Sequence, residues 1–380
     1  MSSLKVENRV EIAMAKCLTV CLTVLGIETS CDETAAAVVR LDNKGKAETL
    51  SDVVLSQTAD HAVYGGVVPE LAARAHITHM DRLIKQAMAE AGLKFNQLDG
   101  VAATAGPGLV GGLLVGMMSA KAIAMSHDLK FLGVNHLEGH ALTPGLTDGL
   151  APPYLLLLVS GGHTQIISVE GVGVYERYGT TIDDALGEAF DKTAKLLNLG
   201  YPGGPAVEVA ARRGVADRFV FPQPLKGQDN CNFSFSGLKT AVRQKAQGLD
   251  KVGEKDVCDI CAGFQVAVVG SVKDRLNNAM NRFLDTHEDI AEPVLVVAGG
   301  VAANQHLRDN LQEICQIHEF KLIVPPVHLC TDNAAMIAYV GIEKFAAGQV
   351  DDMTLAARPR WPLDKHSPAM LGSGKKGAKA

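Results

Sequence analysis

Two histidines four residues apart give the clearest chemical signal in this chain. His136 and His140 belong to the segment His-Leu-Glu-Gly-His, and on a helix this spacing puts both imidazoles on one face, within reach of a single metal ion. We expect this helix to lie at the protein surface. A third ligand must come from elsewhere, and Asp332 offers a carboxylate in a turn ahead of a predicted helix over 334–345. Asp332 equally suits the N-cap of that helix.

The acidic residue between the two histidines bears on the kind of reaction. A zinc peptidase with an HExxH motif needs a glutamate directly after the first histidine. Here the glutamate is Glu138, two positions after His136 and rotated from it by roughly 200° around a helix. It cannot share the metal-facing side, so the spacing disfavours a metallopeptidase.

Three glycine-rich turns offer backbone N–H groups to an anion. The turns at 160–164 and 299–304 each follow a buried apolar run, and Tyr-Pro-Gly-Gly-Pro at 201–205 forms a third, rigid turn. Each is weak on its own, because Gly-Gly turns are common between strands and helices. Together they favour phosphate or nucleotide binding, although none of them matches the Walker pattern or a GxGxxG fingerprint with a downstream acid.

The elements that position these residues follow one order twice. Buried runs at 21–28 and 154–160 predict buried strands, and each ends in small polar residues and glycine. The same patterns predict further strands at 35–40, 47–55, 165–169, 175–179 and 294–298, and helices at 69–91, 184–197, 206–213, 256–284 and from about 306. The chain is therefore predicted to form two related lobes. Proline and glycine at 144–153 favour a boundary there, which gives an extension 1–23, a first lobe 24–150, a second lobe 151–348 and a C-terminal segment 349–380 ending in a solvated tail.

Composition limits the partners of the protein. The 380 residues are 47% apolar, which is enough for two or three hydrophobic cores and excludes wholesale disorder. Lys and Arg number 36 against 42 Asp and Glu, so the net charge of −6 attracts neither nucleic acid nor an anionic membrane. One Trp, six Tyr and eleven Phe are poor material for general single-strand binding. The apolar run 17–27 is shorter than the ~20 residues of a membrane span.

The cysteines indicate a reducing compartment. Eight cysteines are too few and too scattered for a disulfide framework in a chain of this length. Cys258 and Cys261 form one CxxC pair without a second such pair, so a four-cysteine zinc site is not predicted. A transit peptide would be rich in arginine, and the first residues of this chain are not. We therefore expect the protein in the cytoplasm.

Several further motifs resemble the bacterial family of tRNA N6-adenosine threonylcarbamoyltransferases. They lie, in the order of the family, at 25–34, 64–70, 104–109, 136–140, 158–163, 183–192, 233–239, 298–304 and 358–362. The resemblance runs from Leu25 to about Leu363 and leaves out only the leader and the lysine-bearing tail.

The resemblance implies an α/β fold of two duplicated lobes, as in actin, sugar kinases and the Hsp70 ATPase, with a nucleotide in the cleft between them. It also implies a reaction, in which a threonylcarbamoyl group passes from threonylcarbamoyl-AMP to N6 of the adenosine 3′-adjacent to the anticodon. The tRNAs would be those that read codons starting with A, and AMP would be released.

The resemblance also assigns site residues by motif. The metal ligands would be His136, His140 and Asp332, and the metal is usually described as iron, which two imidazoles and a carboxylate suit as Fe(II) while leaving zinc and magnesium open. The adenylate contacts would be Leu158, Val159, Ser160, Gly161, Gly162, Asp191, Gly204 and Asn304.

The implied chemistry needs no enzyme nucleophile, because the carbonyl is already activated by its link to phosphate. Ser160, Thr164 and Cys31 are therefore interpreted as binding or structural residues. Asp32 and Glu33, in a loop after the first strand, are candidates to orient the reacting groups or relay a proton, and equally to cap or pair with a neighbour.

A net acidic chain fits tRNA poorly, so a partner is expected to help. The family works with a shorter paralogous subunit, which pairs through the first lobe, and with a small P-loop ATPase. Local basic candidates for tRNA contact are Arg212, Arg213, Arg218, Lys239, Arg243, Lys245, Arg358 and Arg360.

Two other classes of function share the implied fold. A small-molecule kinase would have no use for the histidine pair. An Hsp70-like binding module would need a substrate domain for which 380 residues leave no room.

Overall fold

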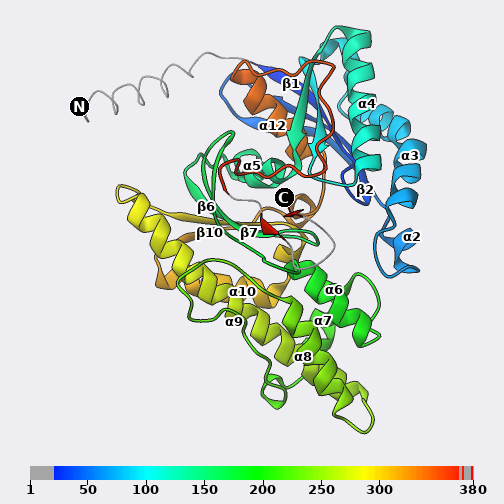
Figure 1. Cartoon of the computed structure of the whole chain (residues 1–380). Helices are drawn as coiled ribbons and strands as arrows, with labels where there is room; N and C mark the ends of the chain where they lie inside the picture. The colour runs from blue at the N-terminus through cyan, green and yellow to red at the C-terminus, as the bar shows by residue number, and fades with distance from the viewer. Residues whose placement is uncertain (1–20, 368–369, 372–377, 380) are drawn as a thin grey trace.

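The computed structural model describes residues 21–367, 370–371 and 378–379. Its chain forms two lobes, each built on a five-stranded sheet (Figure 1). The first sheet contains β1 (Leu22–Glu28), β2 (Glu33–Leu41), β3 (Ala47–Ser56), β4 (Gly100–Gly106) and β5 (Lys130–Asn135). The second contains β6 (Tyr154–Val159), β7 (Thr164–Gly171), β8 (Val174–Thr180), β9 (Val294–Ala298) and β10 (Lys321–Ile323).

The strand order repeats from one sheet to the other. The first sheet runs β3-β2-β1-β4-β5 and the second, in the same sense, β8-β7-β6-β9-β10. In each, the central strand is antiparallel to the next strand in the chain, β2 or β7, and parallel to β4 or β9. The prediction of two duplicated α/β lobes is confirmed.

Two long helices, α3 (Pro69–Glu90) and α4 (Val110–His127), cover the outer face of the first sheet. The other helices of this part of the chain are α2 (Thr58–Ala62), the short 3-10 helix η1 (Phe95–Gln97) and α5 (His136–Asp148). α3 places Met80, Leu83 and Ala87 against the sheet at helical spacing, and Pro69 begins it without losing a helical hydrogen bond. The helix predicted over 69–91 is thus confirmed within one residue.

The second lobe carries most of the remaining helices. They are α6 (Leu186–Leu196), α7 (Gly203–Ala211), η2 (Ala216–Arg218), α8 (Ser236–Gln247), α9 (Glu254–Thr286), η3 (Gly300–Ala303), α10 (Gln305–Ile317), α11 (Val327–Cys330) and α12 (Ala335–Ala346). Residues of α6, α7 and α9 share one core with the outer face of the second sheet, and η3 and α10 follow β9 directly. The helices predicted here are confirmed to within three residues at each end.

Helices α5 and α12 lie between the two sheets. A single core joins their apolar residues to side chains of β1 and β6. α12 packs so closely on β1 that a Cβ added to Gly26 would lie 2.2 Å from the carbonyl oxygen of Ala334. This differs from the predicted division, because α12 falls within 151–348 yet covers the first sheet. The predicted boundary at 144–153 also begins inside α5.

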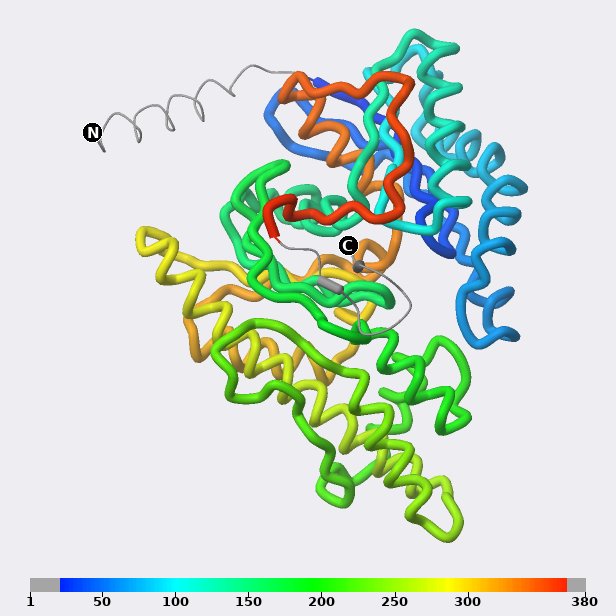
Figure 2. The backbone as a smooth tube through the Cα atoms, in the orientation of Figure 1, coloured from blue at the N-terminus to red at the C-terminus, as the bar shows by residue number. Residues whose placement is uncertain are grey.

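The segment after α12 returns across the first lobe (Figure 2). Lys121 Nζ donates to the carbonyl oxygens of Met353 and Leu355 at 2.8 and 2.7 Å, and Asn135 Nδ2 donates to the carbonyl of Trp361 at 3.0 Å. Residues 349–364 are therefore part of the fold. Beyond 367 the structure describes only β11 (Met370–Leu371) and β12 (Ala378–Lys379), so most of the predicted tail, like nearly all of the predicted extension 1–23, lies outside the described residues.

Candidate metal and substrate site

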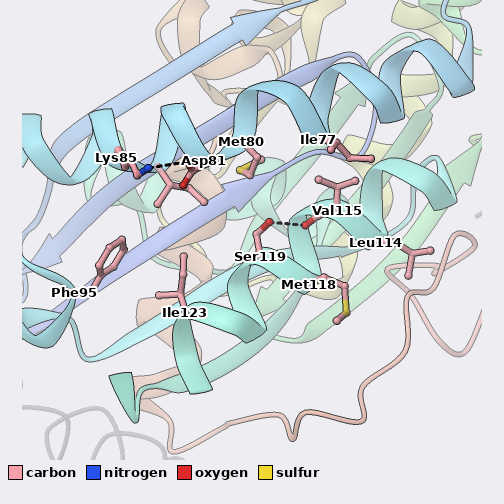
Figure 3. A pocket seen from close by; sticks show the side chains of 11 residues that line it. Ile77, Met80, Asp81, Lys85, Phe95, Leu114, Val115, Met118, Ser119 and Ile123 are labelled. Carbon is pink, nitrogen blue, oxygen red and sulfur yellow. Dashed lines mark hydrogen bonds and ion pairs between the residues drawn. The ribbon is translucent and has the colours of Figure 1, made fainter. Parts of the chain in front are cut away.

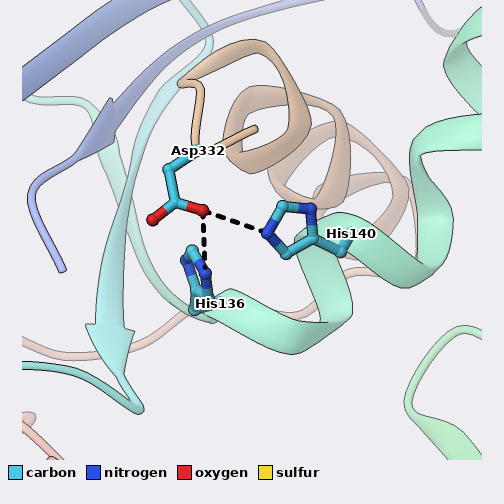
Figure 4. A group of neighbouring side chains, drawn as sticks. All are labelled: His136, His140 and Asp332. Carbon is cyan, nitrogen blue, oxygen red and sulfur yellow. Dashed lines mark hydrogen bonds and ion pairs between the residues drawn. The ribbon is translucent and has the colours of Figure 1, made fainter. Parts of the chain in front are cut away.

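Three side chains predicted as metal ligands converge on one point (Figure 4). His136 Nε2 lies 3.4 Å and His140 Nε2 lies 3.2 Å from the same oxygen, Oδ1 of Asp332. The two imidazole rings are nearly perpendicular, at 89°, and the three ligand atoms lie within 4.8 Å of one another. Two imidazole nitrogens and a carboxylate form a donor set for a divalent transition metal.

The start of α5 fixes the first two ligands. His136 is the first residue of this helix, directly after β5, and Asn135 caps it by accepting a hydrogen bond from the N–H of Leu137 at 2.9 Å. His136 and His140 are only 7% and 1% exposed. The expectation of a surface helix is wrong, because α5 is enclosed between the two sheets.

The turn before α12 fixes the third ligand. Asn333 Oδ1 accepts a hydrogen bond from the N–H of Met336 at 2.9 Å. Asn333 therefore performs the capping that the sequence also allowed for Asp332, whose carboxylate faces the histidines instead.

A buried carboxylate orients His136 from behind. Glu28, at the end of β1, is fully buried, and its Oε2 lies 3.0 Å from Nδ1 of His136. The same oxygen accepts from Thr104 Oγ1 at 2.5 Å, and Oε1 accepts from the N–H of Ser30 at 2.5 Å. With Nδ1–H held by Glu28, Nε2 of His136 is aimed at Asp332, which is the arrangement that metal-binding histidines usually show. The residues present therefore fit a metal ion.

The ionisable side chains of this cluster shift one another's pKa. Burial alone would lower the pKa of His136, but Asp332 and Glu28 outweigh it and raise that pKa well above its usual value. Burial would raise the pKa of Asp332, but the two histidines lower it far below its usual range. Glu28 and Asp332 thus favour a positive charge between them, which a bound cation would supply.

Glu138 points away from this cluster. Its Oε2 lies 2.5 Å from Nζ of Lys344 on α12, and its Oε1 accepts from the hydroxyl of Tyr175 on β8 at 3.0 Å. The inference that Glu138 does not share the metal-facing side is confirmed. The glutamate instead ties α5 to α12 and to the second sheet.

The first two glycine turns lie back to back. In the turn after β6, the N–H of Ser160 donates to the carbonyl of His163 at 2.8 Å, and Ser160 Oγ accepts from the N–H of His163 at 3.1 Å. A Cβ on Gly161 or Gly162 would meet no atom within 4 Å. Gly299, with φ of 95°, sits so close behind that its Cβ would lie 2.4 Å from the carbonyl oxygen of Val159.

The third glycine turn joins the others through α6. Asp191 on α6 accepts a hydrogen bond from the N–H of Gly203 at 2.7 Å, and burial raises its pKa. A Cβ on Gly204 would point into open space. Asn304 is 7% exposed and caps α10, because its Oδ1 accepts from the N–H of Leu307 at 2.9 Å.

These turns adjoin the metal ligands. The Cβ position of Gly300 lies 4.0 Å from Cγ2 of Thr331, the neighbour of Asp332. On the side of the first lobe, burial and then the charges of Asp332 and Asp32 raise the pKa of Glu33 to about 9. The structure thus brings Asp32 and Glu33, the three ligands and the glycine turns into one region between the lobes.

Comparison with known proteins identifies the family. Residues 48–339 match the family model described as tRNA N6-adenosine threonylcarbamoyltransferase. Two proteins with that name, from Sinorhizobium medicae and Brucella suis, are each 60% identical to this chain; each alignment covers 94% of this chain and 100% of the relative. The chain belongs to this family. It is therefore a transferase that modifies adenosine in tRNA.

Solved structures agree on the fold. HypF of T. kodakarensis superposes with a TM-score of 0.58 over 87% of this chain and 48% of that chain, at 14% sequence identity. A full-length HypF in a phosphate- and nucleotide-bound form gives a TM-score of 0.53 over 85% of this chain and 46% of its own. At these identities the likeness shows only that this threonylcarbamoyltransferase has the predicted two-lobed fold.

Sequence reasoning missed Glu28 and Lys344 in this family member. Glu28 contacts the ligand His136 from behind, and Lys344 ties α12 to Glu138 of α5, but neither is itself one of the three ligands. Glu28 had a detectable signal, because a glutamate that ends a buried apolar strand needs a partner to offset its charge. Lys344 had none, since a lysine near the end of a helix is usually a solvated charge.

Three of the basic candidates for tRNA contact are already neutralised. Arg212 pairs with Glu208 at 2.7 Å, Arg213 with Glu254 at 2.8 Å, and Arg218 with both Asp256 and Asp259 at 2.5 and 2.7 Å. The guanidinium of Arg358 lies over the ring of Trp361. Lys239, Arg243 and Lys245 are exposed along α8.

Helix α4 is long and apolar enough to cross a membrane by length and composition alone, and 39% of it is buried. It packs on the first sheet, as core helices of globular proteins do, and its buried Lys121 binds the C-terminal segment.

Proposed function

We propose that this chain transfers the threonylcarbamoyl group of threonylcarbamoyl-AMP to N6 of the adenosine 3′-adjacent to the anticodon, in tRNAs that read codons starting with A. The observation that carries the proposal is the junction of a three-ligand cluster with three glycine turns between the lobes. A kinase of the same fold would have no use for the buried histidines.

His136, His140 and Asp332 would hold a divalent cation, with Glu28 fixing the ring of His136. We propose Fe(II), which this donor set suits, and metal analysis distinguishes it from zinc or magnesium. A cation bound there would supply positive charge to the phosphate of the adenylate as AMP departs.

The second lobe would hold the adenylate. Leu158, Val159 and Ser160 lead from β6 into a turn where the backbone N–H groups of Gly161 and Gly162 would face an approaching phosphate with no Cβ in the way. Gly204 leaves open space beside Asp191, and Asn304 stands at the start of α10. These groups would keep the carbonyl in place while the adenine base approaches.

Asp32 and Glu33 would act on the nucleophile. As the N6–carbonyl bond forms, the bond from the carbonyl carbon to the phosphate oxygen breaks, AMP leaves with the electron pair, and N6 gives up a proton. A carboxylate must receive that proton or orient the amine that loses it. Burial and the charges of Asp332 and Asp32 raise the pKa of Glu33 to about 9, so a protonated Glu33 would orient the reacting groups by donating a hydrogen bond, and Asp32 would receive the proton.

Replacement of one metal ligand tests the proposal. His140→Ala removes one of three ligands, and we expect the purified protein to lose at least about tenfold in metal affinity together with most of its transfer activity. His318→Ala, which alters a histidine at the end of α10 whose Nε2 lies 3.0 Å from Oδ1 of Asn277, is the matched control. Metal content by elemental analysis and transfer to tRNA are measured for both. Full metal and full transfer in His140→Ala would show that the site lies elsewhere.

The shorter paralogous subunit has a candidate surface on the first lobe. Between α3 and α4 runs a groove of about 660 Å³, lined mainly by apolar side chains (Figure 3). Ile77 is 68% exposed, Met118 59% and Leu114 48%. Large apolar residues clustered in this way at a surface mark a protein interface, and we propose that helices of the paralogue cover them. The P-loop ATPase would join that assembly.

A charge placed in the groove tests this partner. Met118→Glu should abolish co-elution with the purified paralogue on gel filtration, because a carboxylate would be buried in an apolar interface. Met125→Glu is the control, since Met125 is 70% exposed on the same helix but does not line the groove. Loss of co-elution in both variants, or in neither of them, would contradict the assignment of this groove to the paralogue.

Exposed cations on α8 are the proposed contacts for tRNA. Lys239 and Arg243 stand one helical turn apart, so they can follow a phosphate backbone together. We expect the isolated chain to bind tRNA weakly and the paralogue to raise both affinity and activity. Because tRNA is its substrate, the protein is proposed to act in the cytoplasm.

A further inference from the structure

A continuous run of buried polar side chains lies beside the loop that carries Asp32 and Glu33. Thr34, Gln57, His61 and His76 belong to three different elements or their ends, and all are at most 3% exposed. A polar group buried without a partner destabilises a protein, so the way in which these four satisfy one another is informative.

The run begins at the segment between α2 and α3. The N–H of Val68 donates to Nδ1 of His61 at 3.3 Å. Because a backbone N–H can only donate, Nδ1 is an acceptor and the proton of the neutral ring is on Nε2. Nε2 of His61 lies 3.3 Å from Oε1 of Gln57 and donates to it.

The run continues to the backbone of the β1–β2 loop. Nε2 of Gln57 donates to Oγ1 of Thr34 at 3.2 Å, and Oγ1 of Thr34 lies 2.7 Å from Nδ1 of His76. Nε2 of His76 lies 3.1 Å from the carbonyl oxygen of Cys31, which can only accept. Burial lowers the pKa of His76, which keeps this ring neutral. Every hydrogen bond therefore runs in one direction, from Val68 to Cys31.

The same residues also hold the next part of the loop. The N–H of Gln57 donates to the carbonyl oxygen of Asp32 at 3.0 Å. Glu33 begins β2 opposite Ser56, whose Oγ donates to Oε1 of Glu33 at 3.2 Å. Three consecutive loop residues are thus tied to the 56–57 segment or to His76.

We propose that Thr34, Gln57, His61 and His76 form a positioning relay, which sets the place of the Cys31–Glu33 loop for threonylcarbamoyl transfer. The inference rests on the proposed role of Asp32 and Glu33. A packed apolar cluster would stabilise the lobe at least as well, whereas a fully satisfied polar network specifies one arrangement of the backbone. None of the four residues touches the substrate; they act through the loop.

The far end of the relay lies against the second lobe. Val68 follows a Tyr-Gly-Gly turn, and a Cβ on Gly65 would lie 3.1 Å from Nζ of Lys195 on α6. α6 also carries Asp191 of the proposed adenylate site. The relay therefore connects a contact between the lobes to the loop on which the proton-handling carboxylates stand.

The test uses the hydroxyl in the middle of the relay. Thr34→Val keeps the shape of the side chain but removes the hydroxyl that links Gln57 to His76, which leaves between them only the longer contact of Gln57 Nε2 with His76 Nδ1 at 3.4 Å. Thr34→Ser keeps the hydroxyl. Ser51→Ala is the structural control, because Ser51 on the adjacent strand β3 accepts only from the N–H of Val38. We measure kcat and KM for tRNA and for threonylcarbamoyl-AMP, bound metal, and the melting temperature.

We expect Thr34→Val to lower kcat by about 10- to 100-fold, as a displacement of reacting groups near 1 Å does. KM and bound metal should stay within twofold of the wild type, and Thr34→Ser should recover most of kcat. Ser51→Ala should lower the melting temperature and leave kcat unchanged. Unchanged kcat in Thr34→Val would overturn the relay.

Failure of the underlying function has a different signature. If Glu33→Gln and Asp32→Asn both keep full kcat, the loop has no chemical role and the proposed function of these carboxylates fails. If those variants are inactive while Thr34→Val is normal, only the relay fails. Parallel loss of metal in Thr34→Val would also contradict the relay, since it would place the effect at the metal ligands.

Discussion

Replacement of Glu28 by glutamine should weaken metal binding while leaving all three ligands in place. Glu28 accepts three hydrogen bonds, from the N–H of Ser30, from Thr104 Oγ1 and from Nδ1 of His136. Glutamine keeps the size of the side chain but has one acceptor oxygen and an NH2 group. In Glu28→Gln at least one donor therefore faces another donor, and the negative charge behind His136 is lost.

The magnitude follows from two losses. Removal of a carboxylate hydrogen-bonded to a ligating histidine typically costs about 10- to 100-fold in metal affinity, which is about 1.4 to 2.7 kcal/mol. Without Glu28, the ring of His136 can also rotate, because Ser30 Oγ at 3.2 Å is then its remaining partner at Nδ1. We therefore expect the loss of metal affinity in Glu28→Gln to fall in the upper part of that range.

The assay is a competition titration of metal-free protein with Co(II) or Zn(II) against a chromophoric chelator. Asp99→Asn is the control, because Asp99 also accepts from a backbone N–H, that of Thr23 at 2.7 Å, far from the ligands. The melting temperature of the metal-free proteins separates weak binding from poor folding. Wild-type metal affinity in Glu28→Gln, with the fold intact, would refute the argument that Glu28 orients His136.

Three further changes have directions set by the structure. Lys344→Met should cost about 3 kcal/mol of unfolding free energy in urea, because it leaves Glu138 charged and buried, and adding Glu138→Gln should recover much of that loss. Gly204→Val should weaken AMP binding in calorimetry without loss of metal, since it fills the open space of the third turn. Asp52→Asn should raise stability at pH 8 by about 1 to 2 kcal/mol but not at pH 4, as pH-dependent melting will show. The sign follows because burial raises the native pKa of Asp52 to about 6, so that the native state loses stability as pH rises through that value.

The fold was predictable where local pattern and tertiary role agree. β1 and β6 are continuous apolar runs because they are central strands buried on both faces, and α3 shows helical spacing because one side faces the sheet. α4 was not predicted. Its apolar residues surround the helix instead of following one stripe, since one side packs on the sheet and the other lines an exposed groove.

The site was predictable only at the level of ligand types. Spacing brought His136 and His140 together. Asp332 was a candidate from its turn ahead of a predicted helix, and the motif resemblance then assigned it. Their burial could not be read from sequence, because it depends on α5 and α12 packing between two sheets that are far apart in the chain. His76, the relay residue that contacts the loop, lies 45 residues from Cys31 and carries no local signal.

The concentration of acidic groups around the ligands makes one last prediction, that AMP binding depends on the metal. Asp32, Glu33, Asp191 and Asp332 influence one another's ionisation or lie beside the same turns. A phosphate dianion approaching them without a cation would be repelled, by about 2 kcal/mol for each unit charge at 8 Å and an effective dielectric constant near 20. Chelation of the metal should therefore lower AMP affinity at least about tenfold.

Adenosine provides the control for this effect. It offers the same base and ribose without the phosphate, so its affinity should change little when the metal is removed. Calorimetry with both ligands, on metal-loaded and chelated protein at one ionic strength, separates the two contributions. Equal losses for AMP and adenosine would mean that the metal holds the fold of the cleft, and no loss for AMP would mean that the phosphate binds away from His136, His140 and Asp332. Only a loss confined to AMP places the phosphate beside the three ligands, where transfer requires it.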